Sequence, residues 1–300
     1  MRHGRGLKLI GVFLVLALVG AACGDSEEAT DTTAATTTVA TTTTVATFDL
    51  VAAADEYLST IPEGWLAVGD TVAFKDAVAA SNAVLIDVRE VGEYEEGHIE
   101  GAINIPIRTL SDNLDKIPTD TQVFIYCKSG FRAALSVGAL HMLGYDNVLG
   151  YPPGWNGWTA AEEPVSTDAV QASTYTVPDI DPTLFAAVDD YLNGIPDGFL
   201  SAGNVEAVKE AIAAGATIVD VRTTDEYTAG HIPGAINVSL RDMANGLSAI
   251  PEDTNTIIYC GSGWRAGMAL SVLQTLGWEN TKSFGGSFKA WKAAEEDIET

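Results

Sequence analysis

The feature that most constrains this chain is an internal repeat of domain length. Residues 87–158 align with residues 220–291 without a gap, and 30 of the 72 positions are identical. All these matched positions lie 133 residues apart, as Cys127 and Cys260 do. Solenoid repeats have periods of about 20–50 residues, so this unit is a whole domain. We therefore expect two similar domains, in agreement with the 300-residue length and with about 100–200 residues per domain.

The limits of the two domains follow from where the repeat begins and ends. Upstream of the aligned segments, residues 57–62 match residues 191–196 at a spacing of 134, so one residue has been gained or lost before the first strand. Between the copies, residues 162–182 are polar, hold three prolines and show no clear periodicity, which is typical of a linker. We expect a first domain at 48–161, a linker at 162–182 and a second domain at 183–300.

Each copy alternates signals for strands and helices. Short apolar runs that suit buried parallel strands occur at 83–88 and 122–126, with counterparts at 217–221 and 256–259. Leucines at near-helical spacing follow each cysteine, and a glycine then marks the end of the predicted helix. Strands that alternate with helices predict an α/β fold, in which each domain is a mainly parallel sheet with helices on both faces.

The first 22 residues carry the pattern of an export signal. Basic residues precede an apolar run at 9–19, and small residues follow at 20–22. This combination is typical of a secretory signal peptide, and the run is shorter than the about 20 residues that a membrane-spanning helix needs. We therefore expect residues 1–22 to be a signal peptide.

Cys23 stands where a bacterial lipoprotein carries its lipidated cysteine, and the segment before it resembles a lipobox. Gly20 departs from that pattern, so cleavage after Ala22 by a general signal peptidase, giving a secreted protein, is an alternative, and an uncleaved anchor is another. Residues 23–47 are rich in Thr and contain no Lys or Arg, so they cannot bury a core. We expect a lipid on Cys23, a flexible tether at 23–47 and a location at the outer face of the bacterial cell membrane.

Each copy also places a cysteine between a predicted strand and a predicted helix. A central glycine lets the loop after the cysteine curl so that backbone N–H groups point inward, and the helix directs its positive end to the same place. An arginine at the end of the loop adds a permanent charge, so the cysteine is expected to react as a thiolate and to hold a persulfide or an oxyanion. A buried structural cysteine is the alternative. The loops are Cys127-Lys128-Ser129-Gly130-Phe131-Arg132 and Cys260-Gly261-Ser262-Gly263-Trp264-Arg265.

The two loops and a second pair of motifs together resemble the rhodanese family. The resemblance spans nearly all of residues 48–300 and implies a tandem of rhodanese domains with sulfurtransferase activity, a covalent cysteine persulfide and no cofactor. Because both copies keep the cysteine, Cys127 and Cys260 are both candidate catalytic residues. The second motifs are Asp87-Val88-Arg89, Glu93-Tyr94 and Gly97 to Asn104 in the first copy, and Asp220, Arg222, Glu226-Tyr227 and Gly230 to Asn237 in the second.

The resemblance also assigns roles within the site. The other loop residues are expected to bind the persulfide or the substrate, and the loops have the six-residue length associated with sulfur transfer. Lys128 resembles the cation of thiosulfate-using members, whereas Gly261-Ser262-Gly263 is similar to the loops of mercaptopyruvate sulfurtransferases. The implied substrates are thiosulfate or mercaptopyruvate as donor and a thiol or cyanide as acceptor. From the residues themselves, we expect ion pairs that brace the loop, because charged residues at a strand end need partners when they are partly buried. A proton relay is the alternative for Asp87, Arg89 and Glu93. The expected bracing residues are Asp87, Arg89, Glu93, Asp220, Arg222 and Glu226.

Composition narrows the remaining classes of function. The chain has 16 Lys and Arg against 41 Asp and Glu, a formal net charge of −25, which argues against nucleic acid as a partner. Its three cysteines are too few for a disulfide framework, and no pair has the spacing of a zinc site, so no metal is expected. Two functions stay open: an extracytoplasmic sulfurtransferase, and a membrane-tethered binding or sulfur-sensing lipoprotein without significant turnover. The cysteine and arginine kept in both loops favour the first.

Overall fold

The computed structural model describes residues 48–300. The predicted signal peptide at 1–22, the predicted lipidation site Cys23 and the predicted tether at 23–47 lie outside the described residues. Among residues 48–300, no helix combines the length and the apolar character needed to cross a bilayer. The described residues belong to one compact unit that contains both repeats.

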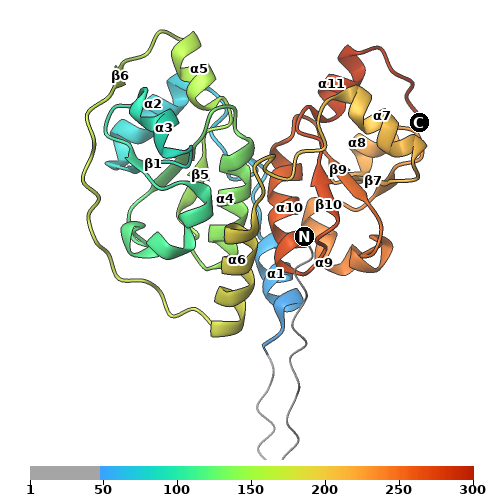
Figure 1. The fold of residues 1–300 in the computed structure, drawn as a ribbon, viewed down its shortest axis with the longest axis horizontal. Helices are drawn as coiled ribbons and strands as arrows, with labels where there is room; N and C mark the ends of the chain where they lie inside the picture. The colour runs from blue at the N-terminus through green and yellow to red at the C-terminus, as the bar shows by residue number, and fades with distance from the viewer. Residues whose placement is uncertain (1–47) are drawn as a thin grey trace, which may run out of the picture. The chain divides into compact units, whose positions relative to one another are not determined.

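Each repeat is built on a four-stranded sheet in which every pair of neighbours is parallel, which confirms the predicted α/β fold (Figure 1). The strand order is β3-β1-β4-β5 in the first repeat and β10-β9-β7-β8 in the second, so the cysteine-bearing strands β4 and β9 are both central. The strands are β1 (Val84–Asp87), β3 (Ile103–Asn104), β4 (Val123–Tyr126), β5 (Val148–Gly150), β7 (Thr217–Asp220), β8 (Ile236–Asn237), β9 (Thr256–Tyr259) and β10 (Thr281–Ser283).

Both faces of each sheet are covered, as the burial of β4 shows. All four residues of β4 are buried. Phe124 and Tyr126 pack in a cluster on one face of the sheet, and Val123 and Ile125 pack in another cluster on the other. Because successive strand residues point to opposite faces, this pattern requires helices on both sides of the sheet. It explains why the strands read as continuous apolar runs and not as alternating ones.

Helices connect the strands in both repeats (Figure 1). Two very short strands, β2 (His98–Ile99) and β6 (Val165–Ser166), pair with each other away from the main sheet. The helices of the first repeat are α1 (Leu50–Ser59), α2 (Thr71–Ser81), α3 (Val91–Glu95), α4 (Phe131–Met142) and α5 (Gly154–Ala160). Those of the second repeat are α6 (Pro182–Gly194), α7 (Val205–Ala213), α8 (Thr224–Thr228), α9 (Met243–Gly246), α10 (Trp264–Thr275) and α11 (Ser287–Ala293).

The two repeats share one hydrophobic core through α4 and α10, the helices that follow the cysteine loops. Small residues let these helices approach closely. A Cβ atom added at Gly138 would lie 2.0 Å from the Ser271 hydroxyl, and one at Gly267 would lie 2.6 Å from the Ala134 Cβ. The contact is therefore specific to these side chains, and it ties the two cysteine loops to a common support.

The first helix of each repeat packs against the other repeat. Helix α1 lies against α9 and the 3-10 helix Leu240–Asp242 of the second repeat, while α6 lies against the 3-10 helix Ile107–Thr109 of the first. Matching hydrogen bonds hold the segment after each of these helices to the other repeat. Arg241 Nε donates to the Ile61 carbonyl at 2.8 Å, and Arg108 Nε donates to the Ile195 carbonyl at 2.7 Å. We call this mutual packing of the first helices an exchange. Each repeat therefore packs its first helix against the other repeat, beyond the boundary expected from the sequence.

The predicted linker lies along the first repeat. After β6, residues 167–181 contain no helix or strand. The segment is attached at intervals, since the Tyr175 N–H donates to the Asp115 carbonyl at 2.6 Å and the Asp168 carbonyl lies 3.2 Å from His98 Nε2. It ends at Pro182, where α6 begins with the carboxylate of Asp181 accepting from the Thr183 N–H.

Candidate functional site

Both candidate catalytic cysteines lie at the carboxyl end of a central strand. Cys127 follows β4 and Cys260 follows β9, and each is only 1% exposed. Both are free thiols. Sites in parallel sheets form beyond the carboxyl ends of the strands, which is where both loops begin. Helices α4 and α10 start four residues after the cysteines, so their N-terminal N–H groups add positive potential there.

The central glycine of each loop is required by the geometry. Gly130 and Gly263 have φ values of 89° and 100°, in the left-handed region. A Cβ atom at Gly130 would lie 2.4 Å from the Pro152 carbonyl oxygen, and one at Gly263 would lie 2.2 Å from the Gly285 carbonyl oxygen. Each loop thus curls against the turn that precedes α5 or α11. In the first repeat this turn contains Pro152 and Pro153, which form part of the rim of the first loop.

In the second repeat, the sulfur of Cys260 accepts a hydrogen bond within its own loop. The Gly263 N–H donates to Cys260 Sγ at 3.1 Å. The Cys260 N–H donates to Ser287 Oγ at 3.1 Å, and that hydroxyl donates to the Phe284 carbonyl at 2.8 Å while lying 3.8 Å from Cys260 Sγ. The sulfur therefore accepts from one backbone donor, while the single hydroxyl proton of Ser287 goes to the Phe284 carbonyl. A backbone donor of this kind stabilises negative charge on the sulfur more than it stabilises a neutral thiol.

Sequence reasoning missed Ser287. It is fully buried and has a φ of 51°, which is uncommon for a residue with a side chain. The signal in the sequence is its place directly after the glycine pair Gly285-Gly286, where α11 begins and where the first repeat has Gly154 in the matching position. The two sites therefore differ by a hydroxyl group beside the cysteine, as well as by the Lys128 and Gly261 pair.

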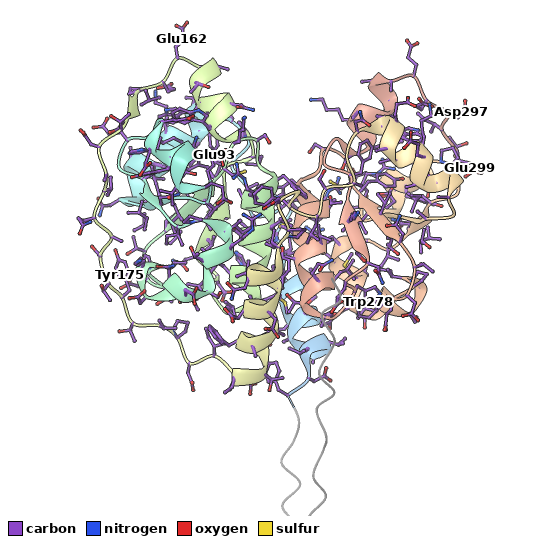
Figure 2. All side chains as sticks on the ribbon, viewed as in Figure 1. Glu93, Glu162, Tyr175, Trp278, Asp297 and Glu299 are labelled. Carbon is purple, nitrogen blue, oxygen red and sulfur yellow. The ribbon has the colours of Figure 1, made fainter. Side chains whose placement is uncertain are left out.

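The arginine that ends each loop is held by a carboxylate from the short helix after the first strand. Arg132 donates two hydrogen bonds to Glu93 of α3, at 2.5 and 2.8 Å, and Glu93 is labelled in Figure 2. Arg265 makes the same pair with Glu226 of α8, at 2.5 and 2.7 Å. Two parallel bonds fix the plane of the guanidinium as well as its position. The predicted members Glu93 and Glu226 thus hold the arginines of the loops.

Electrostatics agree with these pairs. Burial opposes the charge on Arg132, but the hydrogen bond to Glu93 and the attraction of Cys127 outweigh it, so the pKa of Arg132 is raised. The same balance, with Glu226 and Cys260, raises the pKa of Arg265. The hydrogen bond from Arg265 lowers the pKa of Glu226 to about 2, against the opposing effect of burial. Each arginine is therefore a fixed cation close enough to its cysteine for the two to interact.

The other predicted bracing residues form a second ion pair in each repeat, and this pair is buried. Arg89 pairs with Asp87 at 2.6 Å and also donates to the Gly97 carbonyl. Arg222 pairs with Asp220 at 2.6 Å and donates to the matching Gly230 carbonyl. Both pairs are buried and join the end of the first strand of each sheet to the next turn. Each charge of these pairs therefore has a partner within the fold, as buried charges require.

Residues of both loops line one cavity of about 490 Å³. The lining includes Ser129-Gly130-Phe131 of the first loop and Ser262-Gly263-Trp264 of the second. Trp264 is buried, and its indole N–H donates to the Trp65 carbonyl at 2.7 Å, so its ring serves the contact between the repeats. Lys128 is exposed. The two loops thus open near each other, with different side chains at their rims.

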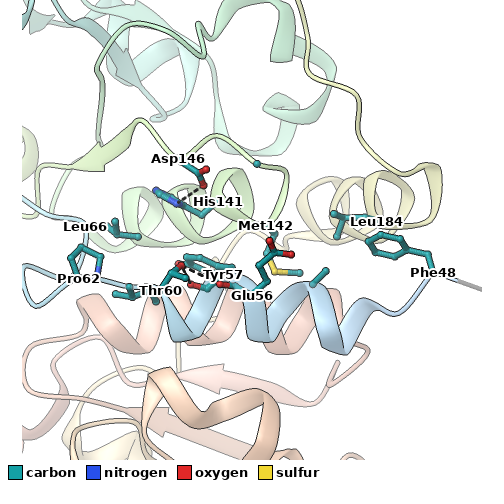
Figure 3. A pocket seen from close by; sticks show the side chains of 13 residues that line it. Phe48, Glu56, Tyr57, Thr60, Pro62, Leu66, His141, Met142, Asp146 and Leu184 are labelled. Atoms are coloured by element: carbon teal, nitrogen blue, oxygen red, sulfur yellow. Dashed lines mark hydrogen bonds and ion pairs between the residues drawn. The ribbon is translucent and has the colours of Figure 1, made fainter.

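A second cavity, of about 680 Å³, lies between α1 and the end of α4 (Figure 3). Tyr57 and His141 stack there with ring centroids 5.4 Å apart, and no residue of either cysteine loop lines it. His141 donates to the Val148 carbonyl, and burial lowers its pKa, which favours the neutral ring. Within residues 48–300, no three His, Cys, Asp or Glu side chains are grouped to hold a metal ion. This cavity therefore shares no residue with the two cysteine loops.

Comparison with known proteins adds an independent finding. A family model for the Rhodanese-like domain matches the chain twice, at residues 70–161 and 204–294. The chain is 31% identical over 111 residues to the "Putative sulfur carrier protein YrkF" of Bacillus subtilis, a match that covers 37% of this chain and 57% of that protein. It is 26% identical over 264 residues to the "Putative thiosulfate sulfurtransferase" of Mycolicibacterium smegmatis, covering 70% of this chain and 88% of that protein.

Solved structures also resemble the chain. SseA of Escherichia coli, described as a 3-mercaptopyruvate sulfotransferase with the rhodanese fold, is 22% identical with a TM-score of 0.38, and the match covers 74% of this chain and 98% of that one. Among the sequence relatives, the chain spans only part of the Bacillus subtilis protein, 57% of its length.

Proposed function

The chain belongs to the rhodanese family and carries two rhodanese-like domains in tandem, and from this membership together with the export-signal pattern at residues 1–22 we propose that it is an extracytoplasmic sulfurtransferase. One observation carries the proposal: the Gly263 N–H donates to the sulfur of a free cysteine inside a loop that a fixed arginine closes. A backbone donor and a nearby guanidinium favour a sulfur that bears negative charge, both as a thiolate and as a persulfide.

The reaction has two steps that balance in atoms and charge. The cysteine thiolate attacks the outer sulfur of thiosulfate, the sulfur–sulfur bond of the donor breaks, and sulfite leaves with the electron pair. A persulfide anion remains on the cysteine. An acceptor thiolate or cyanide then attacks the outer sulfur of this persulfide, and the electron pair of the broken bond restores the cysteine thiolate.

The residues of each loop divide the work. The N–H groups of the loop and of the helix that follows it stabilise the negative charge on the attacking sulfur and then on the persulfide. Arg132 and Arg265 attract an anionic donor while Glu93 and Glu226 keep them in place. Lys128 adds an exposed cation at the first loop only. Because both loops have a free cysteine and a paired arginine, both domains take part.

A turnover assay on the full chain in detergent tests this function. Thiosulfate and mercaptopyruvate are compared as donors with cyanide as acceptor, and thiocyanate is measured. A Cys127→Ser, Cys260→Ser double variant is the control. We expect thiocyanate formation that the double variant loses, and an intact mass raised by one sulfur atom after the donor alone. A persulfide that forms without any turnover, with either donor and with cyanide or a thiol, would instead support the binding or sensing lipoprotein.

The location outside the cytoplasm is part of the same proposal. It is supported by the charged start, apolar run and small residues before Cys23, and by the Thr-rich segment after it. We propose that Cys23 is lipidated and that the folded part acts at the outer face of the membrane. Mass analysis of the protein from bacterial membranes should find an N-terminal peptide that begins with a lipid-modified Cys23. A soluble chain that begins at an unmodified Cys23 would refute the anchor.

A further inference from the structure

Two aromatic residues at matching places in the repeats have an unusual backbone. Trp65 and Phe199 lie 134 residues apart, the spacing of the repeat in this region. Their φ values are 53° and 50°, and the leucine after each one also has a positive φ. Two consecutive residues with side chains in the left-handed region are costly, and such a conformation persists only where the surrounding structure enforces it. The feature occurs in both repeats, so it calls for an explanation beyond a local irregularity.

Each of these rings lies against the loop arginine of the other repeat. The Arg132 Cζ atom is 4.9 Å from the centroid of the Phe199 ring, and the Arg265 Cζ atom is 4.7 Å from the Trp65 ring. A second arginine of that other repeat stacks on the same ring, since Arg108 Cζ lies 4.6 Å from Phe199. The matching Arg241 Cζ lies 4.3 Å from Trp65. The exchange of first helices brings this about, because each aromatic follows the helix that crosses over.

In the second site, Trp65 and Glu226 together contact the guanidinium of Arg265. Glu226 accepts two hydrogen bonds from Arg265, and the Arg265 Cζ atom lies over the Trp65 ring. The guanidinium also lies beside the cysteine loop, because a Cβ atom added at Gly261 would be 3.3 Å from Arg265 Nη2. With the two hydrogen bonds and the ring contact both in place, the guanidinium has little freedom to move away from the cysteine loop.

We propose that Trp65 and Phe199 are positioning residues that each repeat supplies to the site of the other. Trp65 holds Arg265 toward Cys260, and Phe199 holds Arg132 toward Cys127. The inference rests on the proposed function for its meaning, since the fixed charge serves an anionic sulfur donor. It follows that neither repeat has a complete site by itself.

The test measures the positive potential at each sulfur in the full chain. Cys127→Ser or Cys260→Ser leaves one site cysteine, and Trp65→Leu or Phe199→Leu is added to each background. The probes are iodoacetate, an anion, and iodoacetamide, its neutral analogue. Both alkylate the thiolate, so the ratio of their rate constants reports local charge and is independent of how much thiolate is present.

We expect a crossed pattern. Trp65→Leu should lower the ratio at Cys260 by about three- to tenfold, the size expected when a cation–π contact is lost, and should leave the ratio at Cys127 within about twofold. Phe199→Leu should do the reverse. Trp65→Phe and Phe199→Trp keep a ring and should keep the ratio. A role limited to filling the contact between the repeats would not move the ratio at one cysteine alone.

Two further points keep the test decisive. If a leucine variant does not fold, Trp65→Met or Phe199→Met fills the space with a flexible side chain that lacks a ring, and the same crossed pattern is expected. Equal changes at both cysteines, or no change at either, would overturn the inference. Alkylation requires no turnover, so a failure of the proposed sulfur transfer and a failure of this inference are observed separately.

Discussion

Removing the hydroxyl of Ser287 with a Ser287→Ala substitution should lower the stability of the protein and the turnover at Cys260, and it should leave the turnover at Cys127 unchanged. The hydroxyl accepts from the Cys260 N–H at 3.1 Å and donates to the Phe284 carbonyl at 2.8 Å, and it is fully buried. Ser287→Ala leaves a buried donor without its partner, which costs about 1–3 kcal/mol of folding free energy. The alanine keeps the strained φ of 51°, so nothing offsets this cost.

Ser287→Gly separates the hydrogen bonds from the strain. Glycine loses the same hydroxyl, but it adopts a positive φ without the penalty of about 1–2 kcal/mol that a side chain incurs there. We therefore expect Ser287→Gly to be more stable than Ser287→Ala, with a net change relative to wild type between a gain of about 1 kcal/mol and a loss of about 2 kcal/mol. This order is the reverse of the one expected in a helix or strand interior, where glycine is the worse residue.

Activity gives the second readout. In the Cys127→Ser background, both Ser287 variants should reduce thiosulfate turnover by about five- to thirtyfold, the equivalent of 1–2 kcal/mol in the barrier. In the Cys260→Ser background, neither variant should change turnover by more than about twofold, since the Ser287 hydroxyl has its hydrogen-bond partners, Cys260 and Phe284, in the second repeat. Thermal melting and the cyanide assay measure the two effects. A Ser287→Ala protein as active as its parent at Cys260, or a glycine variant less stable than the alanine variant, would show the reasoning to be wrong.

Three other predictions follow from the same geometry. Gly154→Ser should destabilise the protein and should not bring a hydroxyl to Cys127, because the Cβ of the new serine would lie 2.4 Å from the Cys127 carbonyl oxygen. Thermal melting measures this, and a melting temperature lowered by less than that of Ser287→Ala would contradict it. The pKa of Glu226 is lowered to about 2, so its contribution to stability is complete above its ordinary pKa, near 4.5, and is lost as pH falls toward 2; melting curves should show the advantage of wild type over Glu226→Gln shrinking across that window. Cys127→Ala should cost more thiosulfate turnover than Cys260→Ala, and Lys128→Gly in the Cys260→Ala background should reduce it about two- to tenfold, since screening limits an exposed cation; if Cys260→Ala alone abolishes turnover, access and not charge decides.

Much of the site could be predicted because its residues act within short stretches of chain. The cysteine, the glycine with positive φ and the arginine of each loop lie within six consecutive residues. Their spacing alone places a sulfur at a strand end, a turn and a helix start. The partner of the arginine was harder to predict, since Glu93 lies 39 residues before Arg132; Glu93 was expected to brace the loop, but its pairing with Arg132 was not predicted.

The hydroxyl beside Cys260 could not be predicted from such stretches. Ser287 lies 27 residues after the cysteine and reaches it because β9 and β10 are neighbours in the sheet. A serine in a turn carries no sign of what its side chain will contact. The glycine at the matching place in the first repeat shows that the turn itself does not require a hydroxyl.

By itself, the sequence determined the duplication, the α/β class, the buried strands and the two cysteine loops. Periodicity and turn residues report local backbone and burial, and those properties set each repeat. The exchange of α1 and α6 was decided only in the tertiary structure, and with it the stacking of Trp65 and Phe199 on the arginines of the opposite repeat. The physical reason is that the two repeats offer nearly equivalent surfaces. An amphipathic helix such as α1 has the same apolar pattern whether it packs on its own repeat or on the other, so the pattern cannot tell which surface it covers.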